Sequence, residues 1–159
     1  MHAAVEFRNV DIIFGDNPAS ALKLLDDGAD RQEILNQTGH VLGVAEASLR
    51  VEPGEVCVLM GLSGSGKSTL LRAVNGLNRV TRGGVLVKHG EGVVDVASCD
   101  ASTLRTLRMS QVAMVFQQFA LLPWRTVEEN VGLGLELRGT ARSERERIVR
   151  EKLELVGIR

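Results

Sequence analysis

The sequence predicts an α/β fold, with a parallel core sheet covered by helices, and three observations predict it. The apolar run EVCVLM, residues 55–60, has no alternation of polar and apolar positions, which is typical of a strand buried on both faces. A glycine-rich turn follows, and residues 67–77 then place leucine and valine at helical spacing. A second apolar run, VAMVF at 112–116, is interpreted as another buried strand.

Composition limits the class of protein. The chain has 159 residues, 44% of them hydrophobic and 25% charged, which is ordinary for a globular domain with a real core. The net charge of −1 gives no electrostatic case for nucleic acid, and we expect no such partner. No apolar stretch reaches the roughly 20 residues that span a bilayer, and residues 1–10 lack the core of a signal peptide. Cys57 and Cys99 lack metal-ligand spacing, and we expect Cys57 to be buried in its strand.

The segment between the first two expected strands is helical. Asn17-Pro18 begins a short helix that stops at Gly28, and Asp30 caps a second helix that ends near residues 38–39. Residues 16–43 therefore form a helical insert. The other expected elements are strands at 3–14 (with Val5, Phe7 and Val10 on one side) and 44–51, a hairpin at 83–96, and helices at 101–108 (capped by Asp100), 126–137 and 143–157.

The glycine-rich turn matches G-x-x-x-x-G-K-[ST], the P-loop. Glycines let successive backbone N–H groups turn inward around an anion, and the following helix start favours negative charge. Lys67 is placed to reach the β- and γ-phosphates, and the Ser68 hydroxyl to bind Mg²⁺. The expected nucleotide-binding residues are Gly61, Leu62, Ser63, Gly64, Ser65, Gly66, Lys67, Ser68 and Thr69.

A second stretch, following the run at 112–116, narrows the class. Together with the P-loop, it resembles the nucleotide-binding subunits of ABC transporters, in which a strand ends in a glutamine followed by F-x-L-x-P-x-x-T-V-x-x-N. The matching positions here are Gln117, Phe119, Leu121, Pro123, Thr126, Val127 and Asn130. The resemblance implies that Gln117, rather than Gln118, reaches Mg²⁺ and the attacking water. It therefore implies Lys67 and Gln117 as catalytic residues and Ser68 and Gln117 as metal ligands.

Two aromatic residues keep alternative interpretations. In this family an aromatic residue near the end of the first strand stacks on adenine, and Phe14 occupies that place. The alternative is that Phe14 belongs to the core. Trp124, in the loop after Gln117, either anchors a helix of a membrane subunit or is a partly buried loop residue.

The insert and the sequence MGLSGSGKST resemble the subgroup that energises import of glycine betaine, proline betaine and choline, without choosing among these solutes. The resemblance implies ATP and Mg²⁺ as cofactors and a site at the cytoplasmic face of the membrane. It implies transmembrane permease subunits and a second ATP-binding subunit as partners, with a solute-binding protein acting indirectly. Residues 1–159 would then be part of an ABC nucleotide-binding domain, with an antiparallel β subdomain, an incomplete parallel core sheet, the insert (16–43), the P-loop (61–69), the Q-loop (117–125) and the start of the helical subdomain (126–159).

Several parts that the resemblance implies are missing from the sequence. There is no L-S-G-G-Q loop and no apolar strand ending in Asp-Glu, and Asp95 lies in the expected hairpin without a following Glu. The three histidines all precede Gln117, so none matches the family's downstream histidine; they are His2, His40 and His89. We therefore expect the N-terminal part of a longer subunit, which binds ATP without efficient hydrolysis. Its buried-type strands would have open edges and favour self-association.

Two other functions remain open. A soluble P-loop kinase or other NTPase would share the phosphate loop, but it needs an arginine-rich lid and its own acidic metal residue, and neither is visible. A non-catalytic nucleotide-binding module would keep the loop without turnover.

Overall fold

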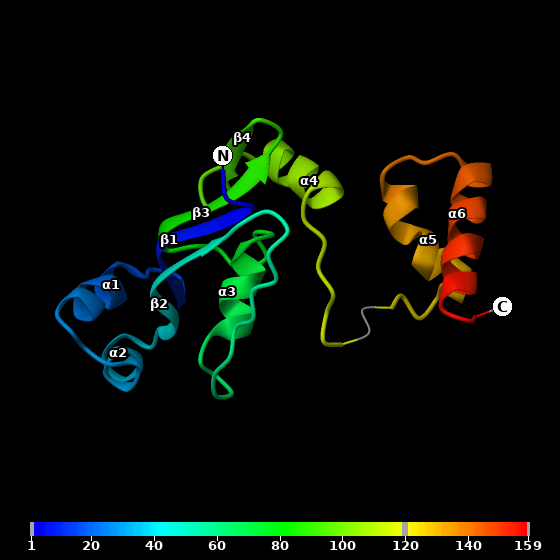
Figure 1. Cartoon of the computed structure of the whole chain (residues 1–159). Coiled ribbons are helices and arrows are strands. Elements are labelled where there is room, and N and C mark those ends of the chain that lie inside the picture. Colours follow the sequence, from blue (N-terminus) through cyan, green and yellow to red (C-terminus); the bar gives the residue numbers. More distant parts are fainter. Residues whose placement is uncertain (1, 119–120, 159) are drawn as a thin grey trace. The chain divides into compact units, whose positions relative to one another are not determined.

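The computed structural model describes residues 2–118 and 121–158, and the chain forms two compact units that meet in sequence at Ala113 and Met114 (Figure 1). The first unit contains β1 (Val5–Phe14), α1 (Ala19–Asp26), α2 (Arg31–Thr38), β2 (Val41–Val51), α3 (Lys67–Ala73), β3 (Arg82–His89), β4 (Gly92–Asp95) and α4 (Ala101–Ser110). The second unit contains α5 (Val127–Leu137) and α6 (Arg142–Leu155). The mixed α/β class is as expected.

The sheet of the first unit is antiparallel, with strand order β2-β1-β3-β4. Val5 of β1 is opposite Val51 of β2 and Val87 of β3, so β1 is a central strand. The hairpin expected at 83–96 is confirmed as β3 and β4. Two non-glycine residues with positive φ, Asn9 at 45° and Glu46 at 48°, mark irregularities in the β1–β2 pairing. These strands form the antiparallel β subdomain that the sequence predicted.

The core lies between this sheet and two helices. Val10, Ile12 and Val85 are fully buried on the strands, while Leu70 of α3 and Leu107 of α4 pack into the same cluster. The burial of Leu70 holds α3, the helix that follows the P-loop, against the sheet. The helix is shorter than predicted, because the chain leaves the helical path after Ala73 and Gly76 adopts a φ of 66°.

The helical insert forms as predicted and has a small core of its own. Asp30 caps α2 in a reciprocal capping box with Glu33, and Gly39 ends it in the left-handed conformation. Buried residues from the insert and from both flanking strands meet in one cluster, namely Ala21, Ile34, Ile13 and Leu42. The insert is therefore packed against the end of β1 and β2 rather than attached only at its ends.

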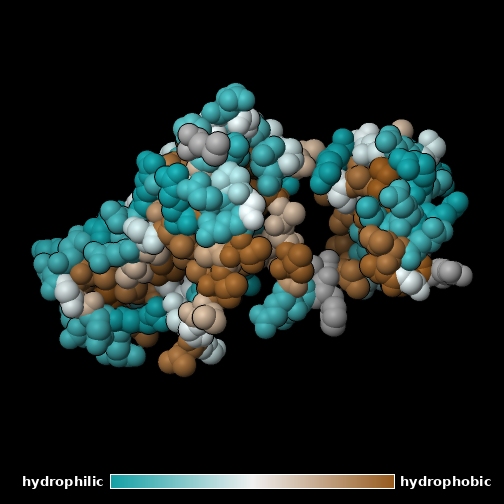
Figure 2. Space-filling view, viewed as in Figure 1, coloured by the Kyte–Doolittle hydropathy of each residue, from teal (hydrophilic) through white to brown (hydrophobic). Residues whose placement is uncertain are grey.

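The two apolar runs expected to be core strands are not strands in this structure. Residues 55–60 and 112–116 have no strand assignment, with Val56 89% exposed and Val115 96% exposed. A strand requires a neighbour for its backbone N–H and C=O groups, and no paired neighbour for these runs exists among the described residues. Figure 2 shows the resulting hydrophobic surface beside α3. The expectation that Cys57 is buried is wrong for the same reason, since its side chain is exposed.

The second unit is a pair of packed helices. Thr126 caps α5 in a capping box with Glu129, and Val149 and Leu153 of α6 are buried. Gly132 lets the helices approach, because a β-carbon there would lie 3.2 Å from Cγ2 of Val149. Of the helices in the part of the chain that is described, none is both long and apolar enough to cross a membrane.

Candidate functional site, a phosphate loop and a glutamine loop

The P-loop runs from Gly61 to Thr69 and leads from the exposed segment 55–60 into α3. Its tip is a tight turn in which the Ser65 N–H donates to the Leu62 carbonyl at 3.2 Å. Gly66 stands at the N-cap with a φ of 95°, and its carbonyl accepts the first helical hydrogen bond, from Leu70, at 2.8 Å. The loop therefore presents an exposed backbone turn directly before a helix, as the motif predicted.

The ammonium group of Lys67 is folded back into the loop. Its Nζ donates to the carbonyl oxygens of Gly61 at 2.9 Å and Leu62 at 2.7 Å, and to Ser65 Oγ at 3.2 Å. Three acceptors match the three donors of an ammonium group. The positive charge is thus held beside the loop by exposed, neutral carbonyl and hydroxyl oxygens, which phosphate oxygens can replace.

The floor of the loop is made by β2. A β-carbon on Gly66 would clash with the carbonyl oxygen of Gly43, so backbone packs directly on backbone at this point. Nothing lies within 4 Å of a β-carbon on Gly64, whose φ of 78° nevertheless favours glycine. Gly66 is therefore needed where the loop packs on β2, and the space beside Gly64 is free for a phosphate group.

Ser68 and Thr69 occupy the first turn of α3. Ser68 is exposed and, with Lys67, lines one end of a groove of about 560 Å³ whose other walls come from β1, β2 and residues 57–59. The carbonyl of Thr69 accepts a 3.0 Å hydrogen bond from Asn78 Nδ2, which fastens the chain after α3 to the loop. An exposed hydroxyl next to Lys67 is a suitable Mg²⁺ ligand.

Phe14 is not a core residue. It is 43% exposed at the end of β1. Its ring approaches Gly43, where a β-carbon would lie 2.7 Å from Phe14 Cε2 and 3.1 Å from Thr69 Cγ2. The ring therefore lies on the same side of Gly43 as the start of α3, with an accessible face.

The glutamine loop belongs to the second unit. Gln117 and Gln118 are both exposed in a bend, and Phe119 lies outside the described residues. The P-loop lies in the first unit and Gln117 in the second, and each is described by itself. Within the second unit, hydrogen bonds join Leu122 to Asn130.

Asn130 organises this stretch, a role that the sequence argument did not anticipate. Its Oδ1 accepts from the Leu122 N–H at 2.8 Å, and its Nδ2 donates to the carbonyls of Leu122 (3.1 Å), Arg125 (3.1 Å) and Thr126 (2.9 Å). Arg125 in turn makes two hydrogen bonds to the Glu136 carboxylate, and these lower the pKa of Glu136. In the sequence, the position of Asn130 four residues after Thr126 was the feature that could have indicated this role.

Trp124 projects into solvent from this ordered loop, with 77% of its surface exposed. The alternative of a partly buried loop residue is therefore not supported. Next to it in sequence, Leu121, Leu122 and Pro123 line a shallow pocket of about 300 Å³ with Val127 and Val131. The loop thus offers an apolar surface with one large aromatic residue.

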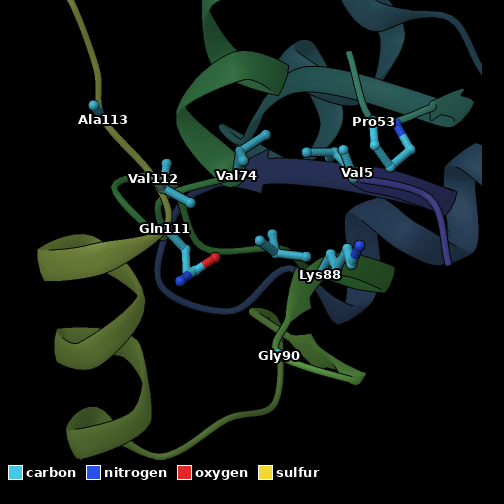
Figure 3. Close-up of a pocket in the computed structure, with 10 residues that line it drawn as sticks. Val5, Pro53, Val74, Lys88, Gly90, Gln111, Val112 and Ala113 are labelled. Atoms are coloured by element: carbon cyan, nitrogen blue, oxygen red, sulfur yellow. The ribbon is translucent and has the colours of Figure 1, made fainter. Parts of the chain in front are cut away.

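Another hollow, of about 640 Å³, lies away from the phosphate loop in the first unit (Figure 3). Val5, Val74 and Val112 point into it, and Lys88 and Gln111 stand at its edge. No residue of the P-loop is among those that line it.

A protein-family model described as ABC transporter matches residues 44–159. The chain belongs to the ABC transporter family. The matched region starts immediately after the helical insert and includes both the P-loop and Gln117. ATP with Mg²⁺ is the usual cofactor of this family.

Curated ABC transporter relatives share the insert as well. The glycine betaine/proline betaine transport system ATP-binding protein ProV of Salmonella typhimurium is 45% identical over 99% of this chain and 38% of its own length. The glycine betaine transport ATP-binding protein OpuAA of Bacillus subtilis is 41% identical over 97% of this chain and 36% of its own length. This chain therefore spans well under half of these relatives.

A solved structure supports the fold. The dimeric ATP-binding cassette MJ0796, in a post-hydrolysis state bound to ADP and phosphate, is 26% identical and superposes with a TM-score of 0.70. The match covers 94% of this chain and 56% of that one.

Proposed function

We propose that this chain carries the phosphate loop and the glutamine loop of an ABC transporter ATP-binding subunit, and that it binds Mg-ATP at residues 61–69. The observation that carries the proposal is the position of the Lys67 ammonium, held by the Gly61 and Leu62 carbonyls at the mouth of an exposed glycine turn. Bound Mg-ATP supplies the transferable γ-phosphate. Lys67 would hold phosphate oxygens in place of the Gly61 and Leu62 carbonyls, and Ser68 would ligate the metal.

Two further residues, one from each unit, are proposed to act on the nucleotide. Phe14 offers an accessible ring face to the adenine base beside the start of α3. Gln117 is the proposed sensor of the metal and the attacking water, which its amide oxygen and N–H₂ group suit chemically. Because the chain contains no Asp-Glu motif to activate water, we expect negligible ATP turnover by these 159 residues alone.

The whole transporter is proposed to import quaternary ammonium solutes of the betaine and choline type. Support comes from relatives named for glycine betaine and proline betaine transport, which match the chain across the insert. The subunit would act as one of a pair at the cytoplasmic face of the membrane, bound to permease subunits. The exposed Trp124 and the apolar pocket beside it form the proposed permease contact.

The binding proposal is tested by titration calorimetry with Mg-ATP on the folded chain. We expect Lys67→Ala to abolish measurable binding, while Arg72→Ala, which removes an exposed charge from the same helix, changes the dissociation constant by less than about threefold. Equal binding by wild type and Lys67→Ala would refute the proposal.

The family role is tested by reading the gene past Arg159. An L-S-G-G-Q loop followed by an apolar strand ending in Asp-Glu is the expected result. An arginine-rich lid in its place would favour the soluble kinase or NTPase alternative.

A further inference from the structure

Among the hydrogen bonds of the described residues, one links a side chain of the helical insert to the P-loop. Arg31, the first residue of α2, donates from Nη1 to the carbonyl oxygen of Gly64 at 2.8 Å. Its Nη2 lies 3.5 Å from the carbonyl oxygen of Gly43, the residue on which Gly66 packs. One guanidinium group thus joins the tip of the phosphate loop to the strand beneath it.

The base of the Arg31 side chain is held firmly, although its end is exposed. The preceding residue, Asp30, is fixed by the capping box with Glu33, in which each side chain accepts the other's backbone N–H. One turn later, Ile34 is fully buried in the cluster with Ile13 and Leu42. The start of α2 is therefore anchored to β1 and β2, and it gives Arg31 a fixed origin.

Holding the Gly64 carbonyl also orients the next N–H group. A trans peptide points its C=O and its N–H in opposite directions. The Gly64 carbonyl faces Arg31, and the Ser65 N–H of the same peptide faces the Leu62 carbonyl, which also accepts from Lys67. The hydrogen bond from Arg31 therefore keeps the Ser65 N–H on the side of the loop where the Lys67 ammonium lies.

We infer that Arg31 is a positioning residue for the nucleotide: it fixes the Gly64–Ser65 peptide plane so that the Ser65 N–H and Lys67 converge on one polyphosphate. The inference rests on the proposed Mg-ATP site and assigns the helical insert a part in forming it. The guanidinium also adds a positive charge beside the loop. Arg31 acts through the loop backbone, and no contact with the nucleotide itself is required.

Two measurements test this role on the 159-residue chain. The first is amide hydrogen exchange across residues 61–66 without nucleotide, and the second is calorimetry with Mg-ATP. We expect Arg31→Ala to speed exchange in the loop about tenfold and to weaken Mg-ATP binding about three- to tenfold, the size of one exposed charged hydrogen bond. Arg31→Lys, which keeps the charge but can hold only one carbonyl well, should lie between wild type and Arg31→Ala.

A matched control separates position from charge. Lys23→Ala removes the same charge from an exposed position on α1, the other helix of the insert, and we expect it to leave both readouts at wild-type values. Should Arg31→Ala fail to fold, Arg31→Gln takes its place, because glutamine removes the charge but keeps part of the aliphatic stem that arginine packs against the surface. Equal loss of affinity in Lys23→Ala and Arg31→Ala would indicate a general charge effect and overturn the inference.

The two proposals fail in different ways. If wild type binds Mg-ATP through Lys67 but Arg31→Ala changes neither loop exchange nor affinity, the role of Arg31 is refuted and the site stands. If Lys67→Ala binds as well as wild type, the nucleotide site is refuted. Loop exchange without nucleotide would still report whether Arg31 orders the turn.

Discussion

The side-chain amide of Asn130 holds both backbone groups of Leu122, accepting from its N–H at 2.8 Å and donating to its carbonyl at 3.1 Å. The side chain of one residue thereby replaces a strand partner for another residue eight positions earlier. This arrangement orders the loop that displays Trp124, without any regular secondary structure in the loop itself.

Asn130→Ala should therefore loosen the loop and destabilise the second unit. The substitution leaves the Leu122 N–H without its acceptor and removes the bonds from the Asn130 amide to the carbonyls of Leu122, Arg125 and Thr126. We therefore expect a loss of about 1–3 kcal/mol in the free energy of unfolding. Hydrogen exchange at residues 121–126 is the measurement. Asn36→Ala, on the exposed surface of α2, is the control, and an equal effect there would contradict the assignment.

The P-loop glycines should differ in their tolerance of alanine. The β-carbon of an alanine at 66 clashes with the Gly43 carbonyl, so the loop must move away from β2. An alanine at 64 meets open space, and it adds only the backbone strain of positive φ, about 1–2 kcal/mol. We expect Gly66→Ala to reduce Mg-ATP affinity at least tenfold more than Gly64→Ala, by calorimetry. The reverse order would show that the floor of the cradle is misassigned.

Two carboxylates share the guanidinium of Arg82, and their removal should have unequal effects. Asp11 is 1% exposed and also accepts from the Glu46 N–H at 2.7 Å, while Asp26 of the insert is more than half exposed. We expect Asp11→Ala to lower the free energy of unfolding by about 2–3 kcal/mol. The substitution removes the acceptor of the Glu46 N–H, and it also removes the ion pair that joins β1 to Arg82 of β3. Asp26→Ala should change it little, since exposed ion pairs contribute little. Chemical denaturation of both variants is the test.

Acid should weaken the first unit through Asp100. Hydrogen bonds from the Ser102 hydroxyl, and from the backbone and hydroxyl of Thr103, hold the pKa of Asp100 well below its ordinary 3.8. Because the pKa of Asp100 is lower in the folded state than in the unfolded state, ionised Asp100 stabilises the fold. This stabilisation is complete above pH 3.8 and is lost as the pH falls below it.

The measurement for Asp100 is urea denaturation at about pH 5 and about pH 3. Asp100→Asn should show a smaller loss of unfolding free energy on acidification than wild type. Glu91→Gln, in the exposed β3–β4 turn, should behave as wild type, and an identical pH response in all three proteins would remove Asp100 from the explanation.

The exposed apolar segments should drive self-association. Val56 and Met60 are 89% and 86% exposed, and a row of unpaired backbone groups beside apolar side chains favours pairing with another copy. We expect wild type to show concentration-dependent sedimentation and Val56→Asp to reduce it. Gln37→Asp adds the same charge on the exposed surface of α2 and should not. A monodisperse wild-type monomer would contradict this expectation.

Features that depend on neighbouring residues were predicted well from the sequence. The Asp30 and Asp100 caps, the hairpin of β3 and β4, and the insert helices all form where their local patterns place them. The P-loop is of the same kind, since the positive φ of Gly66 and the start of α3 are requirements of the turn itself. Capping and turn geometry are complete within a few residues, so the chain needs no distant partner to adopt them.

The amino-acid sequence by itself determined the identity of the phosphate loop, the caps and the family to which the chain belongs. Tertiary structure alone decided that residues 55–60 and 112–116 are not strands, because pairing depends on a neighbour and not on hydrophobicity. It also decided that Phe14 keeps an exposed face, and that Arg31, 33 residues before Gly64 in the chain, reaches the loop carbonyl. Contacts over such separations arise from the packing of the insert on β1 and β2, which no local pattern in the sequence records.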